Sequence, residues 1–170
     1  MRGEQPSGPP PLDASPFRFA VIVSRFNEAI TASLRRSALD ALSQAGASGS
    51  NVLTFDVPGA YEIPQAARAA AETGRFDAIV CLGCVIRGET PHFDYISSAV
   101  AHGIMTAAGD TGVPMAFGVL TTDTLEQASS RARDGADDNK GREAALAAIE
   151  MAGLYRRLGN IPSRPTGFGG

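Results

Sequence analysis

The chain has 170 residues, of which 44% are hydrophobic and 19% charged, and its formal net charge is -3. These values are typical of one globular domain and weigh against a general nucleic-acid-binding protein. No apolar run approaches the ~20 residues of a membrane span, and residues 1–16 lack the apolar core of a signal peptide. We therefore expect a cytoplasmic protein that binds neither nucleic acid nor membrane.

Segments rich in Val and Ile alternate along the chain with segments that repeat apolar residues at helical spacing. We predict one domain over residues 17–158, with a flexible segment at 1–16 and a tail at 159–170. The alternation favours right-handed βαβ units, and hence an α/β, flavodoxin-like three-layer sandwich: a four-stranded parallel sheet with helices on both faces. The expected strands are 17–24, 52–55, 77–85 and 114–120, and the expected helices are 28–45, 61–72, 90–108, 125–133 and 140–157.

Two cysteines, Cys81 and Cys84, lie on the third predicted strand. Residues three apart on a strand face opposite sides of the sheet, so a disulfide between them is not expected. No second pair of Cys or His accompanies them, which argues against a metal site. The sequence therefore predicts a protein without a bound metal.

Polar or flexible residues follow each predicted strand, at 24–27, 58–62, 87–92 and 121–123. The carboxyl ends of parallel strands lie at one edge of a sheet, where open α/β sheets bind their ligands. We therefore expect these four loops to converge on one pocket.

The third of these loops carries the clearest signal. Thr90 is a good N-cap and Pro91 suits the first position of a helix. The N–H groups of such a helix start can bind an anion, and a histidine beside them, His92, can exchange protons near pH 7. The alternative for His92 is an ordinary surface histidine.

Other candidates also have two interpretations. Phe26 could stack on a planar ring or pack against the following helix. Glu62 could accept hydrogen bonds from sugar-like hydroxyls or complement a helix dipole. Arg131 lies near a predicted helix C-terminus, where a cation is favourable in any case.

Five segments, in this order and at matching spacing, resemble the lumazine synthase (6,7-dimethyl-8-ribityllumazine synthase) family. They are SRFNEAIT, VPGAYEIP, LGCVIRGETPHFDYIS, GVPMAFGVLTTDTLEQASSRA and NKGREAA, and the resemblance covers about residues 17–157. It implies condensation of 5-amino-6-(D-ribitylamino)uracil with 3,4-dihydroxy-2-butanone 4-phosphate, the penultimate step of riboflavin synthesis. Inorganic phosphate and water are released, and no metal or organic cofactor takes part.

The resemblance also implies roles for individual residues. Phe26 would stack on the pyrimidine, and the backbone of Cys84, Val85 and Ile86 would contact it. The ribityl chain would be lined by Ala60, Tyr61 and Glu62, with Glu62 binding its hydroxyls.

The phosphate end of the site is implied in the same way. Backbone N–H groups of Glu89 and Thr90 would hold the phosphate, and His92 would transfer protons. A neighbouring subunit would contribute Phe117 to close the pocket, Arg131 to pair with the phosphate, and Lys140, which is the only lysine in the chain.

The family assembles as pentamers, so the resemblance implies a homo-oligomer with active sites shared between subunits, and a riboflavin synthase is a candidate partner. A pentamer, a decamer and a 60-subunit capsid stay open. The long loop before Lys140 and the prolines at residues 9–11 favour a pentamer over a closed capsid. Rival functions are a riboflavin synthase of the related archaeal type, a non-catalytic flavin- or lumazine-binding shell protein, and a flavodoxin-like carrier of FMN.

Overall fold

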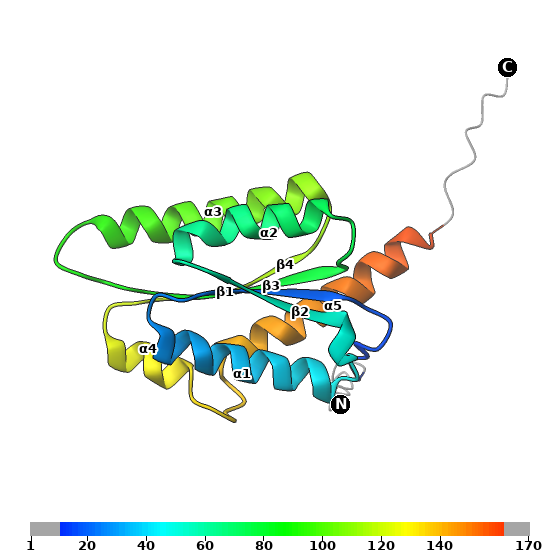
Figure 1. Cartoon of the computed structure of the whole chain (residues 1–170), viewed down its shortest axis with the longest axis horizontal. Helices are drawn as coiled ribbons and strands as arrows, with labels where there is room; N and C mark the ends of the chain where they lie inside the picture. The colour runs from blue at the N-terminus through cyan, green and yellow to red at the C-terminus, as the bar shows by residue number, and fades with distance from the viewer. Residues whose placement is uncertain (1–10, 162–170) are drawn as a thin grey trace, which may run out of the picture.

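The computed structural model describes residues 11–161, which form one parallel sheet covered by helices (Figure 1). Its strands run in the order β2-β1-β3-β4, and all neighbouring pairs are parallel. The strands are β1 (Phe19–Ser24), β2 (Val52–Val57), β3 (Ala78–Ile86) and β4 (Met115–Thr122). The α-helices are α1 (Glu28–Gln44), α2 (Ile63–Glu72), α3 (His92–Thr111), α4 (Leu125–Arg131) and α5 (Lys140–Gly159). Two short 3-10 helices, η1 (Gly49–Asn51) and η2 (Ala60–Glu62), precede β2 and α2.

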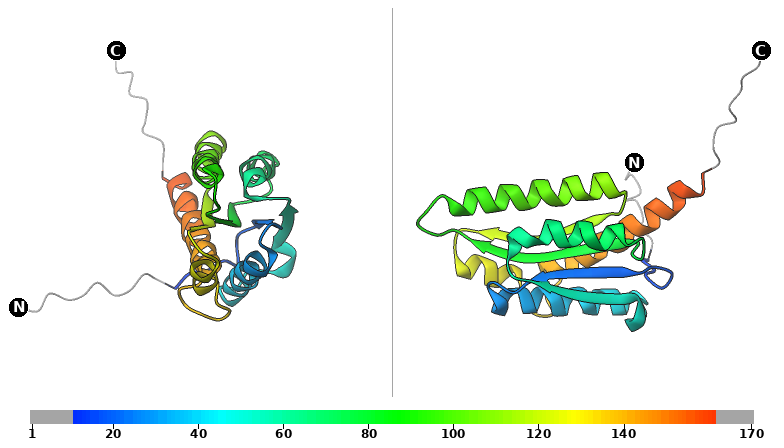
Figure 2. Two further views of the ribbon diagram at one scale, coloured as in Figure 1. Left: turned by 90° about the vertical axis from the view of Figure 1, so that its left-hand side faces the viewer. Right: turned by 45° about the horizontal axis from the view of Figure 1, so that its top comes forward.

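Helices cover both faces of the sheet, so the predicted three-layer α/β architecture is confirmed. One face packs against α1, α4 and α5, and the other against α2 and α3 (Figure 2). Both central strands are apolar and buried over most of their length, as expected for parallel strands with helices on both sides. Cys81 and Cys84 belong to opposite hydrophobic layers, and both are free, as the strand periodicity predicts.

Several element boundaries differ from the sequence prediction for local reasons. The first strand begins at Phe19 instead of residue 17, because Phe17 N–H donates to the Ala14 carbonyl in a turn. The predicted helix over residues 61–72 divides into η2 and α2, with Pro64 tolerated in the first turn of α2. The helix predicted to reach residue 133 ends at Arg131.

The packed domain also extends beyond its expected start at residue 17. Ala14 is fully buried, and its N–H donates to the Ala45 carbonyl just after α1. The expectations for residues 1–10, including the first two prolines of the run at 9–11, and for residues 162–170 lie outside the described part of the chain. No helix within residues 11–161 is long and apolar enough to cross a membrane.

Candidate active site

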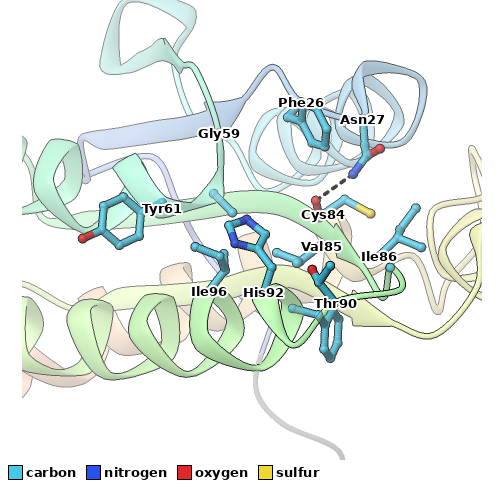
Figure 3. A pocket seen from close by; sticks show the side chains of 13 residues that line it. Phe26, Asn27, Gly59, Tyr61, Cys84, Val85, Ile86, Thr90, His92 and Ile96 are labelled. Carbon is cyan, nitrogen blue, oxygen red and sulfur yellow. Dashed lines mark hydrogen bonds between the residues drawn. The ribbon is translucent and has the colours of Figure 1, made fainter.

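The order in which successive strands are added to the sheet reverses between β1 and β3. These strands are neighbours, yet β1 leads into α1 on one face and β3 leads into α3 on the other. A crevice forms at the carboxyl ends of two strands that diverge in this way, and ligands of α/β proteins bind there. A cavity of about 330 Å³ occupies this place. It is lined by Phe26, Asn27, Gly59, Ala60, Tyr61, Cys84, Val85, Ile86, Gly88, Thr90, His92, Phe93 and Ile96 (Figure 3).

The end of β3 presents an open backbone edge to this cavity. Pairing between β1 and β3 stops at Leu82, whereas pairing between β3 and β4 continues to Ile86. The carbonyl of Cys84 faces the β1 side, where it accepts a 3.0 Å hydrogen bond from the Asn27 side chain. Backbone groups alternate along a strand, so the N–H and C=O of Ile86 face the same open side. They offer a ligand one donor and one acceptor.

Asn27 shapes the entrance, and the sequence prediction did not include it among the site residues. Its backbone lies in the left-handed region, with φ 61° and ψ 50°, just before α1. Asn tolerates this conformation better than most residues. The resulting turn leaves Phe26 71% exposed beside the cavity, while the Asn27 amide ties the turn to the end of β3 (Figure 3). The alternative interpretation of Phe26 as a residue packed against α1 is therefore wrong.

The start of α3 differs from the prediction by one position. Pro91 occupies the N-cap position, without a side-chain cap, and the helix begins at His92. The Pro91 carbonyl accepts the N–H of Asp94, so Thr90 is not the N-cap and instead lines the cavity. His92 points from the first turn of α3 toward the turn at Gly59 (Figure 3).

The turn after β2 supplies Ala60 and Tyr61 to the cavity wall. Glu62 does not line the cavity. One of its carboxylate oxygens accepts a 3.1 Å hydrogen bond from Gly59 N–H, and Glu62 N–H donates to the Gly59 carbonyl at 3.2 Å, which closes the turn around η2. In this structure Glu62 stabilises the turn that places Ala60 and Tyr61.

Cys84 is the one thiol at the cavity. Burial raises its pKa to about 11, and burial raises the pKa of Cys81 to about 12. Both thiols therefore stay protonated near neutral pH, and the thiolate is the nucleophilic form. Cys84 lines the cavity, while its thiol is buried in the hydrophobic layer shared with α1, α4 and α5.

A second cavity, of about 540 Å³, lies along β4, α4 and the start of α5. It gathers Phe117, Arg131 and Lys140, together with the loop at residues 121–123. The two cavities share no lining residue. The expectation that all four strand-end loops converge on one pocket is therefore wrong, because the loop after β4 faces the second cavity.

Arg131 is one of two cationic side chains that line this second cavity, together with the carboxylates of Asp123, Asp138 and Glu143. Its guanidinium donates to the Gln127 carbonyl at 3.1 Å, and it forms no ion pair within residues 11–161. Lys140, in contrast, pairs with Glu143 at 3.3 Å. Arg131 is therefore the cation at this cavity that no carboxylate neutralises within the described residues.

The loop between Arg131 and Lys140 is anchored at both ends despite its length. Ser33 and Arg36 of α1 bind the Asp134 carboxylate, and these hydrogen bonds, Arg36 first, hold its pKa below the usual range. Asn139 is fully buried and caps α5. Its amide also donates to the Arg133 carbonyl. These contacts hold Lys140 at the cavity in spite of the long loop.

Comparison with known proteins places this arrangement in a family. The model of the 6,7-dimethyl-8-ribityllumazine synthase family matches residues 16–156. The chain belongs to this family. A 6,7-dimethyl-8-ribityllumazine synthase of Syntrophus aciditrophicus (strain SB) is 52% identical over 147 residues, which are 86% of this chain and 95% of the relative. Another, from Salinibacter ruber (strain DSM 13855 / M31), is 55% identical over 141 residues, or 83% and 90% of the two chains.

The residues suggested by the lumazine synthase resemblance fall into two groups. The first cavity brings together Phe26, Ala60, Tyr61, Cys84, Val85, Ile86, Thr90 and His92, and the second brings together Phe117, Arg131 and Lys140. Glu62 and Glu89 line neither cavity, and Glu89 is exposed between two residues that line the first. Sequence reasoning did not include Asn27, Gly59, Gly88, Phe93 and Ile96. Among the described residues, no group of three or more His, Cys, Asp or Glu is placed to hold a metal ion.

Proposed function

We propose that this chain is a lumazine synthase. It condenses 5-amino-6-(D-ribitylamino)uracil with 3,4-dihydroxy-2-butanone 4-phosphate to 6,7-dimethyl-8-ribityllumazine, with loss of phosphate and water. Family membership supports the activity. The observation that carries the site assignment is the crevice between β1 and β3, which has an exposed aromatic ring, an open strand edge and His92 around one cavity.

The first cavity suits the pyrimidine substrate. The exposed ring of Phe26 can stack on a planar heterocycle, and the open N–H and C=O of Ile86 complement a ring amide. Tyr61 and Ala60 line the side on which we place the ribityl chain. We assign Glu62 to the ribityl hydroxyls through the carboxylate oxygen that does not cap Gly59.

The reaction needs proton transfer and positioning more than a strong nucleophile in the protein. The substrate amine attacks the ketone carbonyl, water leaves to form an imine, and phosphate is eliminated. Ring closure and loss of a second water complete the product. We assign the proton transfers to His92 and the phosphate to the backbone of residues 89–90, since general acid–base help and orientation together supply most of such a rate enhancement.

We propose that a neighbouring subunit completes each site with Phe117, Arg131 and Lys140. Two observations support this arrangement. Within one chain these residues line a different cavity from His92. The second observation is an apolar groove over β4, between α3 and α5, that is lined by Phe117 and by the exposed side chains of Met105, Met151 and Tyr155. Large exposed apolar patches mark interaction surfaces.

The assembly that we propose is a ring pentamer and not a closed 60-subunit capsid. A surface that meets a different surface on the next copy forms a ring when the rotation between copies closes, and a pentameric ring would have five shared sites. The cytoplasm is the proposed compartment, and two unpaired cysteines suit a reducing environment. Light scattering gives the subunit number directly.

The direct test of function is product formation by the purified protein. With both substrates and no added metal we expect fluorescent lumazine to accumulate, at an unchanged rate after treatment with a chelator. Turnover of lumazine alone to riboflavin would indicate the archaeal type of riboflavin synthase. A yellow protein that binds FMN and makes no product would indicate a flavin carrier, and a metal requirement after chelation would contradict the cofactor-free reaction.

Mixed oligomers test the shared site. We expect His92→Ala and Arg131→Ala proteins, unfolded together and reassembled in equal amounts, to regain about one quarter of the wild-type sites. An intact site forms wherever an Arg131→Ala subunit provides His92 and its His92→Ala neighbour provides Arg131. The rate of lumazine formation per subunit measures the recovery.

A matched mixture separates the two arrangements. Wild-type protein reassembled with the double mutant His92→Ala/Arg131→Ala leaves about one quarter of the sites intact if they are shared, and about one half if each lies within one subunit. If the two single mutants regained no activity when mixed, and the matched mixture kept about one half of the wild-type activity, the catalytic groups would lie within one chain.

A further inference from the structure

Arg87 lies between the two cavities and connects their walls. Its Nε donates to the Asp123 carboxylate at 2.8 Å, and Asp123 lines the second cavity. Its Nη2 lies 3.4 Å from the Asp94 carboxylate, in the first turn of α3. The guanidinium carbon also lies 4.4 Å from the centre of the Phe93 ring, which lines the first cavity.

These contacts enclose a loop that has little packing of its own. Residues 88–92 are all exposed, and a side-chain carbon added at Gly88 would meet no atom within 4 Å. Arg87 directly precedes this loop, and its guanidinium contacts Phe93 and Asp94 just beyond the end of the loop. Its backbone N–H adds a 2.8 Å hydrogen bond to the Thr122 carbonyl of β4. Arg87 therefore links the residues on both sides of the loop to the edge of β4.

The charge of Arg87 is already balanced by its neighbours. Two carboxylates, from Asp123 and Asp94, contact its guanidinium, whereas Arg131 contacts none within the described residues. An arginine that is engaged on two edges and one face is poorly placed to bind the substrate phosphate. Its contacts suit it to holding other groups in position.

We propose that Arg87 is a positioning residue for the reaction: it clamps the loop 88–91 to the edge of β4, so that the backbone of Glu89 and Thr90 and the ring of His92 stay in productive geometry. This inference rests on the proposed function. The clamp requires the shape of the guanidinium, because it uses two separate N–H donors and the flat face of the group. Lysine keeps the charge but has neither the fork nor the plane.

The test compares Arg87→Lys and Arg87→Gln with the wild type. We expect both substitutions to lower kcat/KM for the butanone phosphate by about 10- to 100-fold, because displacements of about 1 Å in an active site cost up to about 100-fold. The loss should consist of a raised KM for the butanone phosphate and a lowered kcat. The KM for the pyrimidine should change less, since the Arg87 guanidinium contacts Asp94, Asp123 and Phe93 but neither Phe26 nor Tyr61.

Arg68 provides a matched control. It also bridges two carboxylates, Glu72 and Asp110, each at 3.0 Å, and its side chain is 47% exposed against 45% for Arg87. It lies on α2 and lines neither cavity. Arg68→Gln should keep wild-type kinetics, and exposed ion pairs of this kind contribute little to stability, so both glutamine variants should melt within a few degrees of the wild type.

Hydrogen exchange tests the clamp independently of catalysis. Amide exchange at position 87 and at Asp94, whose N–H groups donate to the Thr122 and Pro91 carbonyls at the two ends of the loop, should become faster in Arg87→Gln than in Arg68→Gln or wild type. Unchanged exchange would overturn the proposal whatever the activity. Faster exchange in a protein that makes no lumazine would support the clamp and contradict the proposed function. Near wild-type kinetics of Arg87→Lys would show that charge alone matters, and an equal loss in Arg68→Gln would show a general effect of lost ion pairs.

Discussion

Arg131→Ala should lower kcat/KM for the butanone phosphate by roughly 30-fold to several thousand-fold. A charged group left without its charged partner in a closed interface costs roughly 2–5 kcal/mol, and Arg131 has no ion-pair partner within residues 11–161 to compete with the substrate. The expected signature in steady-state kinetics is a large rise in the KM for the butanone phosphate. An unchanged KM would place Arg131 outside the phosphate site.

His92→Ala should cost less than Arg131→Ala. General acid–base help contributes about 100-fold or more, and His92 is exposed at the cavity, where water can replace part of its function. Arg133→Ala is the matched control for the arginine, because Arg133 lies two residues further on, pairs with Asp138 at 3.5 Å, and lines neither cavity. A milder loss in Arg131→Ala than in His92→Ala would reverse the ranking of the two residues.

The layered fold could be predicted because its signals are local. The apolar strand around Cys81 and the helical repeat of Ile30, Leu34, Ala38 and Leu42 each determine an element without reference to the rest of the chain. Alternation of such elements leaves few topologies open. The loops that follow those strands could be named as candidates from their position alone, whereas Cys84, Val85 and Ile86 were suggested only by the resemblance to the lumazine synthase family.

The division of the site into two cavities could not be predicted in the same way. It depends on β4 being the outer strand, so that the loop after it faces α4 and α5 and not the crevice between β1 and β3. The positive φ of Asn27 and the capping role of Glu62 likewise depend on atoms far along the chain or on the exact turn. No pattern of residue types along the sequence reveals such contacts.

The close approach of α5 to α1 is the clearest case of a tertiary requirement that the sequence conceals. Gly141 follows Lys140 directly, and a side-chain carbon built on it would overlap the Leu34 carbonyl oxygen and lie 2.7 Å from the carbonyl carbon. The neighbour is helix backbone, which cannot turn aside as a side chain could. Gly141 is therefore what allows α5 to begin against α1, with Lys140 at the second cavity.

Gly141→Ala should consequently destabilise the protein. Inserting one carbon into a packed interface typically costs about 1–3 kcal/mol, and more where backbone must move, which corresponds to a melting temperature lower by roughly 3–10 °C for a chain of this size. Thermal scans at one rate measure the shift. The displaced start of α5 should also move Lys140, so lumazine formation should fall at temperatures where the variant is still folded.

Gly153→Ala, further along the same helix, should have the opposite effect. A carbon added at Gly153 meets no atom within 4 Å, and alanine in a helix interior is favoured over glycine by roughly 0.5–1 kcal/mol. Both variants replace a glycine of α5 by alanine. Melting temperatures that shift in opposite directions would therefore isolate the effect of the contact with Leu34. If Gly141→Ala proved as stable as Gly153→Ala, the start of α5 would have to lie further from α1 than the structure places it, and the position assigned to Lys140 would be wrong as well.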